Sequence, residues 1–137
     1  MNSRSVSVTY LTALLHSLEK QGIPSSEFLS QYQIDGGFLN NRENRVDANT
    51  YMHMYEDAAA LTEDANLGLH VGADIKPGYY GVVGYAMMSC HTLEEALAKH
   101  LRYQSLVGSF GNACLVDADE QLVLIWQTPD TPPRQVA

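Results

Sequence analysis

The sequence predicts an α+β fold in which the N-terminal two thirds are mostly helical and an antiparallel β-hairpin follows. Two observations lead to this prediction. Before Gly108, apolar residues recur every three or four positions in several segments, which is the spacing of one helix face. After Gly108 there are two runs rich in β-branched and aromatic residues, separated by the polar stretch "DADEQ". The length of 137 residues favours a single domain with one core.

The first two helices are predicted to form a helical hairpin. The first spans residues 8–20 and ends at Gly22, and the second is short and lies within residues 23–34, with Pro24 in its first turn. The residues predicted to face inward are Val8, Leu11, Leu14, Leu15, Leu18, Phe28, Leu29 and Tyr32. The segment 35–46 is rich in Gly, Asn and charge, so we expect a loop there.

A longer helix is predicted over residues 48–62, with Asp47 as its N-terminal cap. Its apolar stripe has helical spacing and fits a core position. The stripe consists of Tyr51, Met54, Tyr55, Ala58 and Leu61. A short helix ending near Gly72 and a turn at Pro77 and Gly78 should follow.

The glycine-rich stretch "PGYYGVVG" predicts close packing. Gly78, Gly81 and Gly84 recur every three residues and match neither of the common phosphate-binding patterns. We therefore expect residues 81–89 to form a helix that packs tightly on a neighbour, since Gly84 and Ala86 leave room for a close backbone.

The next helix start is predicted from a capping box. Thr92 and Glu95 have the S/T-x-x-E spacing, and apolar positions continue to Val107. The runs "NACLVDA" and "QLVLIWQT" then predict the β-hairpin. The prolines of "PDTPPRQVA" should stop the second strand. Because a two-stranded hairpin alone is marginal, we expect the chain to be a truncated part of a larger domain.

Charge argues against nucleic-acid binding by this segment. The chain has 8 Lys and Arg against 16 Asp and Glu, so its net charge is −8. A negative charge of this size repels phosphate backbones. Neither a membrane span nor a signal peptide is expected, so the sequence predicts a cytoplasmic protein. Cys90 and Cys114 lack paired spacing, and we expect them to be reduced thiols.

No group of residues in the sequence predicts catalysis, a cofactor or a metal. The histidines are scattered, without two at the spacing that places ligands on one helix face. There is no G-x-S-x-G motif, and Cys90 and His91 are sequence neighbours whose side chains point apart. The prediction is therefore a protein that is not an enzyme.

The segment Arg45 to Gly108 resembles the N-terminal effector-sensing region of AraC/XylS-type bacterial transcription regulators. The resemblance rests on "LGLHVG", "PGYYGVVGYAMMSCHTLEEAL" and "RYQSLVG", which occur in this order after a helix. It implies an arabinose-binding-type sensing domain that binds a small-molecule effector and reaches DNA only through a separate C-terminal helix-turn-helix domain. It leaves open whether the domain forms a homodimer. The alternative is a stand-alone protein interaction module without a ligand.

An effector site is predicted from aromatic residues that combine apolar rings with a polar group. Arg102 is the charge that could hold a carboxylate, although it also fits a solvated helix position. The predicted effector-binding residues are Tyr51, Tyr55, Tyr85, Arg102, Tyr103 and Trp126.

Overall fold

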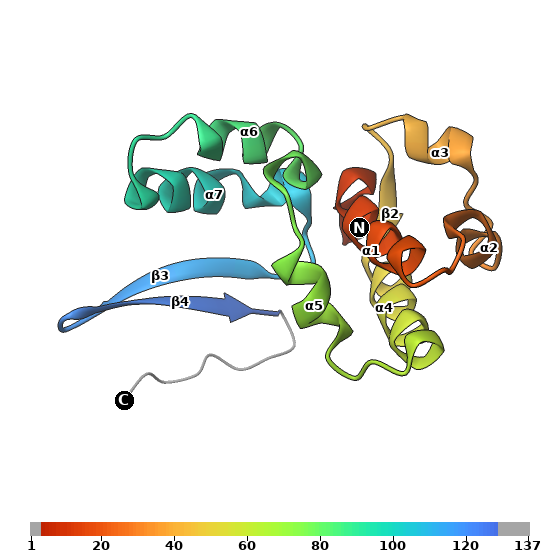
Figure 1. The fold of residues 1–137 in the computed structure, drawn as a ribbon. Helices are drawn as coiled ribbons and strands as arrows, with labels where there is room; N and C mark the ends of the chain where they lie inside the picture. Colours follow the sequence, from red (N-terminus) through yellow and green to blue (C-terminus); the bar gives the residue numbers. More distant parts are fainter. Residues whose placement is uncertain (1–3, 129–137) are drawn as a thin grey trace.

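The computed structural model describes residues 4–128, and Figure 1 shows their arrangement. Helices fill most of the chain up to residue 107 and a β-hairpin follows, so the predicted α+β fold is confirmed. The elements are β1 (Ser5–Ser7), α1 (Val8–Lys20), α2 (Ser25–Ser30), α3 (Gly36–Asn40), β2 (Arg45–Asp47), α4 (Ala48–Thr62), α5 (Leu67–Ala73), the 3₁₀ turn η1 (Pro77–Tyr80), α6 (Val82–Met88), α7 (Leu93–Val107), β3 (Asn112–Ala118) and β4 (Gln121–Gln127).

The molecule has two halves. Helices α1 to α5 make one half, and α6, α7 and the β3–β4 hairpin make the other, with α7 between α6 and the hairpin (Figure 1). Between residues 4 and 128, no helix is long and apolar enough to cross a bilayer.

Helix α1 lies at the centre of the core and contacts α2, α4, α5 and η1. Its five predicted inward residues are all buried, and Leu11, Leu14 and Leu18 have no exposed surface. Fully burying a leucine side chain stabilises a fold by about 1.5–3 kcal/mol. The predicted apolar face of α1 is thus confirmed, and it holds the helical half together.

Side-chain caps start two of the longer helices at the predicted positions. The Asp47 carboxylate accepts hydrogen bonds from the N–H groups of Asn49 and Thr50, at 2.9 and 3.0 Å. The Thr92 hydroxyl accepts from the N–H of Glu95 at 3.1 Å. Such caps are typically worth about 1 kcal/mol each. The predicted starts of α4 and α7 are both confirmed.

The segment 35–46 is not the predicted loop. Asp35 caps the short helix α3 by accepting from the N–H of Phe38 at 2.8 Å. Strand β2 then pairs antiparallel with β1, and the buried side chains of Val6 and Val46 face each other. A strand of three residues has too few positions to show an alternating pattern, which explains why the sequence did not reveal this pair.

The end of α7 is attached to the same strand pair. Gly108 forms an isolated antiparallel bridge with Val6. The guanidinium of Arg45 donates to the main-chain carbonyls of Ser105 and Leu106, at 3.5 and 3.1 Å. A cation at a helix C-terminus bonds carbonyls that have no partner inside the helix. This junction joins the two halves of the molecule.

One residue of the predicted α4 stripe lies outside the core. Tyr51, Met54 and Ala58 are buried, whereas Leu61 is 56% exposed. Leu61 belongs to the last turn of α4, which ends at Thr62, and at Glu63 the backbone turns with a left-handed φ of 54°. Leu61 borders an open hollow beside Gly22 and Phe28, which leaves its side chain accessible to solvent.

The β3–β4 hairpin confirms the prediction made from the last two apolar runs. Its register extends from Asn112 opposite Gln127 to Ala118 opposite Gln121. Asp119 occupies the turn with φ 56°, a conformation that aspartate tolerates better than most residues. The proline-rich segment predicted to stop β4 lies outside the described residues, and truncation of a larger domain stays a prediction.

Gly84 shows that the glycine-rich stretch serves packing. Helix α6 approaches η1 so closely that a Cβ on Gly84 would lie 1.7 Å from the carbonyl oxygen of Pro77. Only glycine fits there without moving the backbone. The prediction of a close backbone approach is confirmed at this position.

Replacing Gly84 should therefore be costly. Gly84→Ala is expected to lower the free energy of unfolding by about 1–3 kcal/mol or more, because main-chain atoms of Pro77 must move. Gly72→Ala is the matched control, since an added Cβ there meets no atom within 4 Å and should stabilise by about 0.4–1 kcal/mol. Urea denaturation measures both variants, and equal stabilities would contradict the packing role of Gly84.

Candidate functional site

The side chain of Gln104 fixes the β-hairpin against α7. Its carboxamide nitrogen donates to the carbonyl of Ala113 at 3.0 Å, and its carboxamide oxygen accepts from the N–H of Ala113 at 2.6 Å. Ala113 lies in β3, opposite Trp126 of β4. Gln104 thus bonds the edge of β3 in the way that a third strand would.

A cavity of about 260 Å³ lies beside this contact, between α7, the hairpin, α1 and η1. It is smaller than several hollows at the surface, and its lining residues come from both halves of the molecule. Its lining residues are Tyr10, Tyr80, His100, Gln104, Val107, Gly108, Phe110, Ala113, Leu124 and Trp126. We call it the seam cavity.

Aromatic rings surround the seam cavity in two groups. The rings of Tyr10 and Tyr80 meet edge to face with centroids 5.0 Å apart, and Tyr80 meets His100 in the same way at 6.0 Å. On the hairpin side, Phe110 and Trp126 have centroids 5.4 Å apart. Ring pairs at these distances are favourable beyond their buried area. The cavity therefore has mostly apolar, aromatic walls.

Two tyrosine hydroxyl groups at and behind the cavity, those of Tyr10 and Tyr51, are held in the neutral form by burial. Tyr10 donates its hydroxyl hydrogen to the Tyr80 oxygen at 3.3 Å. Burial is the main cause that raises the pKa of Tyr10, and the bond to Tyr80 adds to it. Burial likewise raises the pKa of Tyr51, which lies behind Tyr10. Because Tyr80 accepts from Tyr10, its own hydrogen is left to donate elsewhere.

His100 has one nitrogen that is buried without a partner. Its Nδ1 receives no hydrogen bond within the described part of the chain and has no contact with solvent. Burial lowers the pKa of His100, since protonation would place an unpaired N–H at this atom. We assign the proton of the neutral ring to Nε2, because a proton on Nδ1 would be a buried N–H without an acceptor, and this leaves an N–H donor on a residue that lines the cavity.

Residues 22–137 match the model of the family described as the arabinose-binding domain of AraC transcription regulators, N-terminal. The chain belongs to this family. The resemblance noted in the segment 45–108 is thus confirmed and extended over most of the chain.

Similar proteins of known class are transcription regulators. The AraC-type domain is 30% identical over 117 residues to HTH-type transcriptional regulators of Mycobacterium tuberculosis and Mycobacterium bovis, which covers 83% of this chain and 34% of each regulator. It is 25% identical over 103 residues to the ornithine utilization regulator of Pseudomonas aeruginosa, covering 75% of this chain and 30% of that protein. The chain therefore spans about a third of the length of these relatives.

The structure brings half of the predicted effector-binding residues of this AraC-type domain together. Trp126 lines the seam cavity. Tyr51 and Tyr55 lie behind it on α4, where the Tyr51 ring contacts both Tyr55 and Phe110, at 5.2 and 5.9 Å. They support the walls from outside and are not lining residues.

The other three predicted residues lie elsewhere. Tyr85 is 60% exposed and lines a different hollow. Arg102 and Tyr103 are exposed on α7, with the guanidinium carbon 5.4 Å from the tyrosine ring centroid. As effector contacts, these residues stay predictions without support from the geometry of the seam cavity.

Sequence reasoning did not select His100 and Gln104 as site residues. They lie four positions apart on α7, so they share a face of the helix, and Val107 continues that face. Helical periodicity could have grouped them. What it could not show is that the hairpin and Tyr10 would cover this face.

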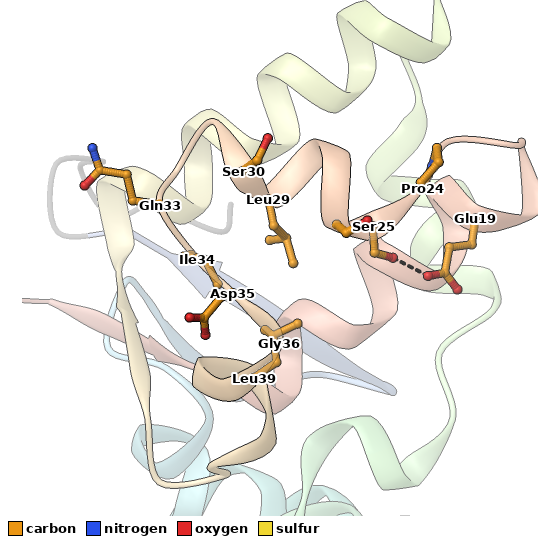
Figure 2. A pocket seen from close by; sticks show the side chains of 11 residues that line it. Glu19, Pro24, Ser25, Leu29, Ser30, Gln33, Ile34, Asp35, Gly36 and Leu39 are labelled. Carbon is orange, nitrogen blue, oxygen red and sulfur yellow. Dashed lines mark hydrogen bonds between the residues drawn. The ribbon is translucent and has the colours of Figure 1, made fainter.

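The two hollows with the greatest volumes in the described part of the chain are less suited to a specific ligand. The largest, about 740 Å³, lies between the end of α1, α2 and α3 (Figure 2). Its carboxylates are already engaged, since Glu19 accepts from the Ser25 hydroxyl and Asp35 caps α3. Another, of about 640 Å³, is lined by Arg42, Lys76 and Tyr85 among others. Both are open at the surface, and neither holds a buried polar atom without a partner within residues 4–128.

The lowered pKa of His100 predicts a pH-dependent stability. The unfolded chain takes up a proton at His100 near pH 6.5, and the folded chain does so only at lower pH. The contribution of His100 to the free energy of unfolding should therefore be fully present above pH 6.5. It should decrease as the pH falls from 6.5 toward the lowered pKa of the folded chain. Urea denaturation at pH 7.5 and 5.5 should show a smaller loss for His100→Gln than for the unchanged chain.

The matched control is His91→Gln, which removes an exposed histidine just before α7. The stability of His91→Gln should depend on pH as strongly as that of the unchanged chain, whereas His100→Gln should show a weaker dependence. An identical loss of stability in the unchanged chain and in His100→Gln would show that His100 is not protected from protonation.

Proposed function

We propose that this domain binds a small-molecule effector in the seam cavity and passes the bound state to a DNA-binding region elsewhere in the regulator. The cavity is the observation that carries the proposal. It combines an apolar aromatic lining with two polar donors, as small-molecule sites do, and its lining comes from both halves of the domain.

The comparisons support the regulatory role. The three relatives are named as regulators, and one of them is named for the utilization of ornithine, which agrees with a response to a metabolite. The family match does not favour the alternative of a stand-alone interaction module. Pairing of two regulators through this domain stays a prediction.

The hairpin is the element through which binding would be transmitted. Trp126 and Leu124 line the cavity from β4, and β4 ends at Gln127, beyond which the chain continues. A ligand in the cavity contacts α7 and β4 at once, so it stabilises one position of the hairpin relative to α7. A ligand shifts an equilibrium only by its different affinity for the two states.

A pair of variants on one strand tests the location. Leu124 and Leu122 lie on the same face of β4 and are 55% and 58% exposed, but only Leu124 lines the cavity. A metabolite screen should find a compound that raises the melting temperature, since a ligand at 100 times its Kd stabilises by about 2.7 kcal/mol. Leu124→Trp should abolish this shift by filling the cavity.

Leu122→Trp is the matched control and should keep the full shift. In the full-length regulator, the same compound should change reporter transcription with Leu122→Trp and not with Leu124→Trp. A shift that survives Leu124→Trp would move the site elsewhere, and a screen without any stabilising compound would contradict effector sensing.

A further inference from the structure

The lining of the seam cavity restricts the chemistry of its ligand. We propose that it takes an uncharged, flat ring compound that carries a hydrogen-bond acceptor, such as a carbonyl or a ring nitrogen. This inference rests on the proposed function, because it assigns a ligand class to the same cavity.

The flat shape follows from the rings that face the cavity. Tyr10 and Tyr80 line it from α1 and η1, and Phe110 and Trp126 line it from the other half. A planar ring can contact such faces and edges over most of its surface, and each aromatic pair adds about 0.5–1.5 kcal/mol beyond buried area. The volume of about 260 Å³ limits the ligand to a small molecule.

The acceptor on the ligand follows from the polar groups that remain available. The amide of Gln104 is already bonded to Ala113. The hydroxyl of Tyr80 accepts from Tyr10 and keeps its hydrogen, and His100 keeps a hydrogen on Nε2 because its Nδ1 is buried without a partner. Each of these two groups has a hydrogen to donate, and the indole N–H of Trp126 is a further donor in the lining, so a ligand that supplies an acceptor fits this lining best.

The absence of charge on the ligand follows from the absence of charge in the lining. Among the described residues that line the cavity there is no Asp, Glu, Lys or Arg. A carboxylate would lose its hydration with no cation beside it, in a chain whose net charge is −8. An ammonium would find phenol oxygens and no carboxylate to pair with its charge. A zwitterionic amino acid would leave both of its charges unpaired.

Benzamide, benzoate and cyclohexanecarboxamide separate these requirements. Benzamide is flat, neutral and carries a carbonyl; benzoate has the same shape with a charge, and cyclohexanecarboxamide keeps the carbonyl without a flat ring. Trp126 is the only tryptophan of the chain, so all tryptophan emission reports on the cavity wall. Benzamide should cause a saturable change in this emission, with benzoate and cyclohexanecarboxamide each binding at least about tenfold more weakly.

Variants of the two donors test the polar part of the inference. Tyr80→Phe and His100→Leu should each weaken benzamide binding by about tenfold, which corresponds to the loss of one hydrogen bond. Tyr85→Phe removes an exposed tyrosine hydroxyl away from the cavity and should leave the affinity unchanged. Tyr80→Phe keeps the ring, so the test stands even if His100→Leu fails to fold. Unchanged affinity in Tyr80→Phe, or in a folded His100→Leu, would remove that donor from the inference.

Two outcomes would overturn the ligand class and leave the proposed function intact. One is benzoate or cyclohexanecarboxamide binding as tightly as benzamide. The other is no saturable binding of any of the three probes, while a metabolite from the screen stabilises the chain and Leu124→Trp abolishes its effect. Benzamide binding to Leu124→Trp can be measured by the shift in melting temperature. If this shift is the same as in the unchanged chain, the cavity is not the site, and the proposed function is overturned with it.

Discussion

The two hydrogen bonds between the Gln104 carboxamide and the main chain of Ala113 join the β-hairpin to the rest of the molecule. A two-stranded hairpin is marginally stable in water, so its position depends on what it docks against. Helix α7 provides that support, and its own end is held by Arg45 and by the bridge between Gly108 and Val6. The hairpin is thus connected to the buried core of α1 through a short chain of contacts.

The seam cavity exists because these contacts hold the hairpin beside α7 without filling the space between them. Gln104 uses its hydrogen bonds on the backbone, whereas Tyr80 and His100 keep a donor each. The residue that attaches the hairpin and the residues proposed to bind the ligand are therefore different. A ligand that satisfies the free donors would act where the attachment of the hairpin rests on few bonds, which suits a sensor whose two states must be close in free energy.

Elements with strong local signals were predictable from the sequence. The caps at Asp47 and Thr92, together with the apolar periodicity, predicted the starts and ends of α4 and α7. The β1–β2 pair was not predictable, because its short strands lie about 40 residues apart and neither shows a period of its own. Of the predicted site residues, only Trp126 lines the cavity, since Tyr10 and His100 meet it through tertiary packing that no local pattern encodes.

Hydrogen exchange of the Ala113 amide tests the central role of Gln104 most directly. In Gln104→Ala this buried amide loses its hydrogen-bond acceptor, which should lower the free energy of opening by about 1–3 kcal/mol and speed exchange about tenfold or more. The emission of Trp126 should shift to longer wavelength. Ser105→Ala, on the exposed face of α7, should change neither. Unchanged exchange at Ala113 and unchanged emission in Gln104→Ala would contradict the account, because the hairpin would then be held by something else.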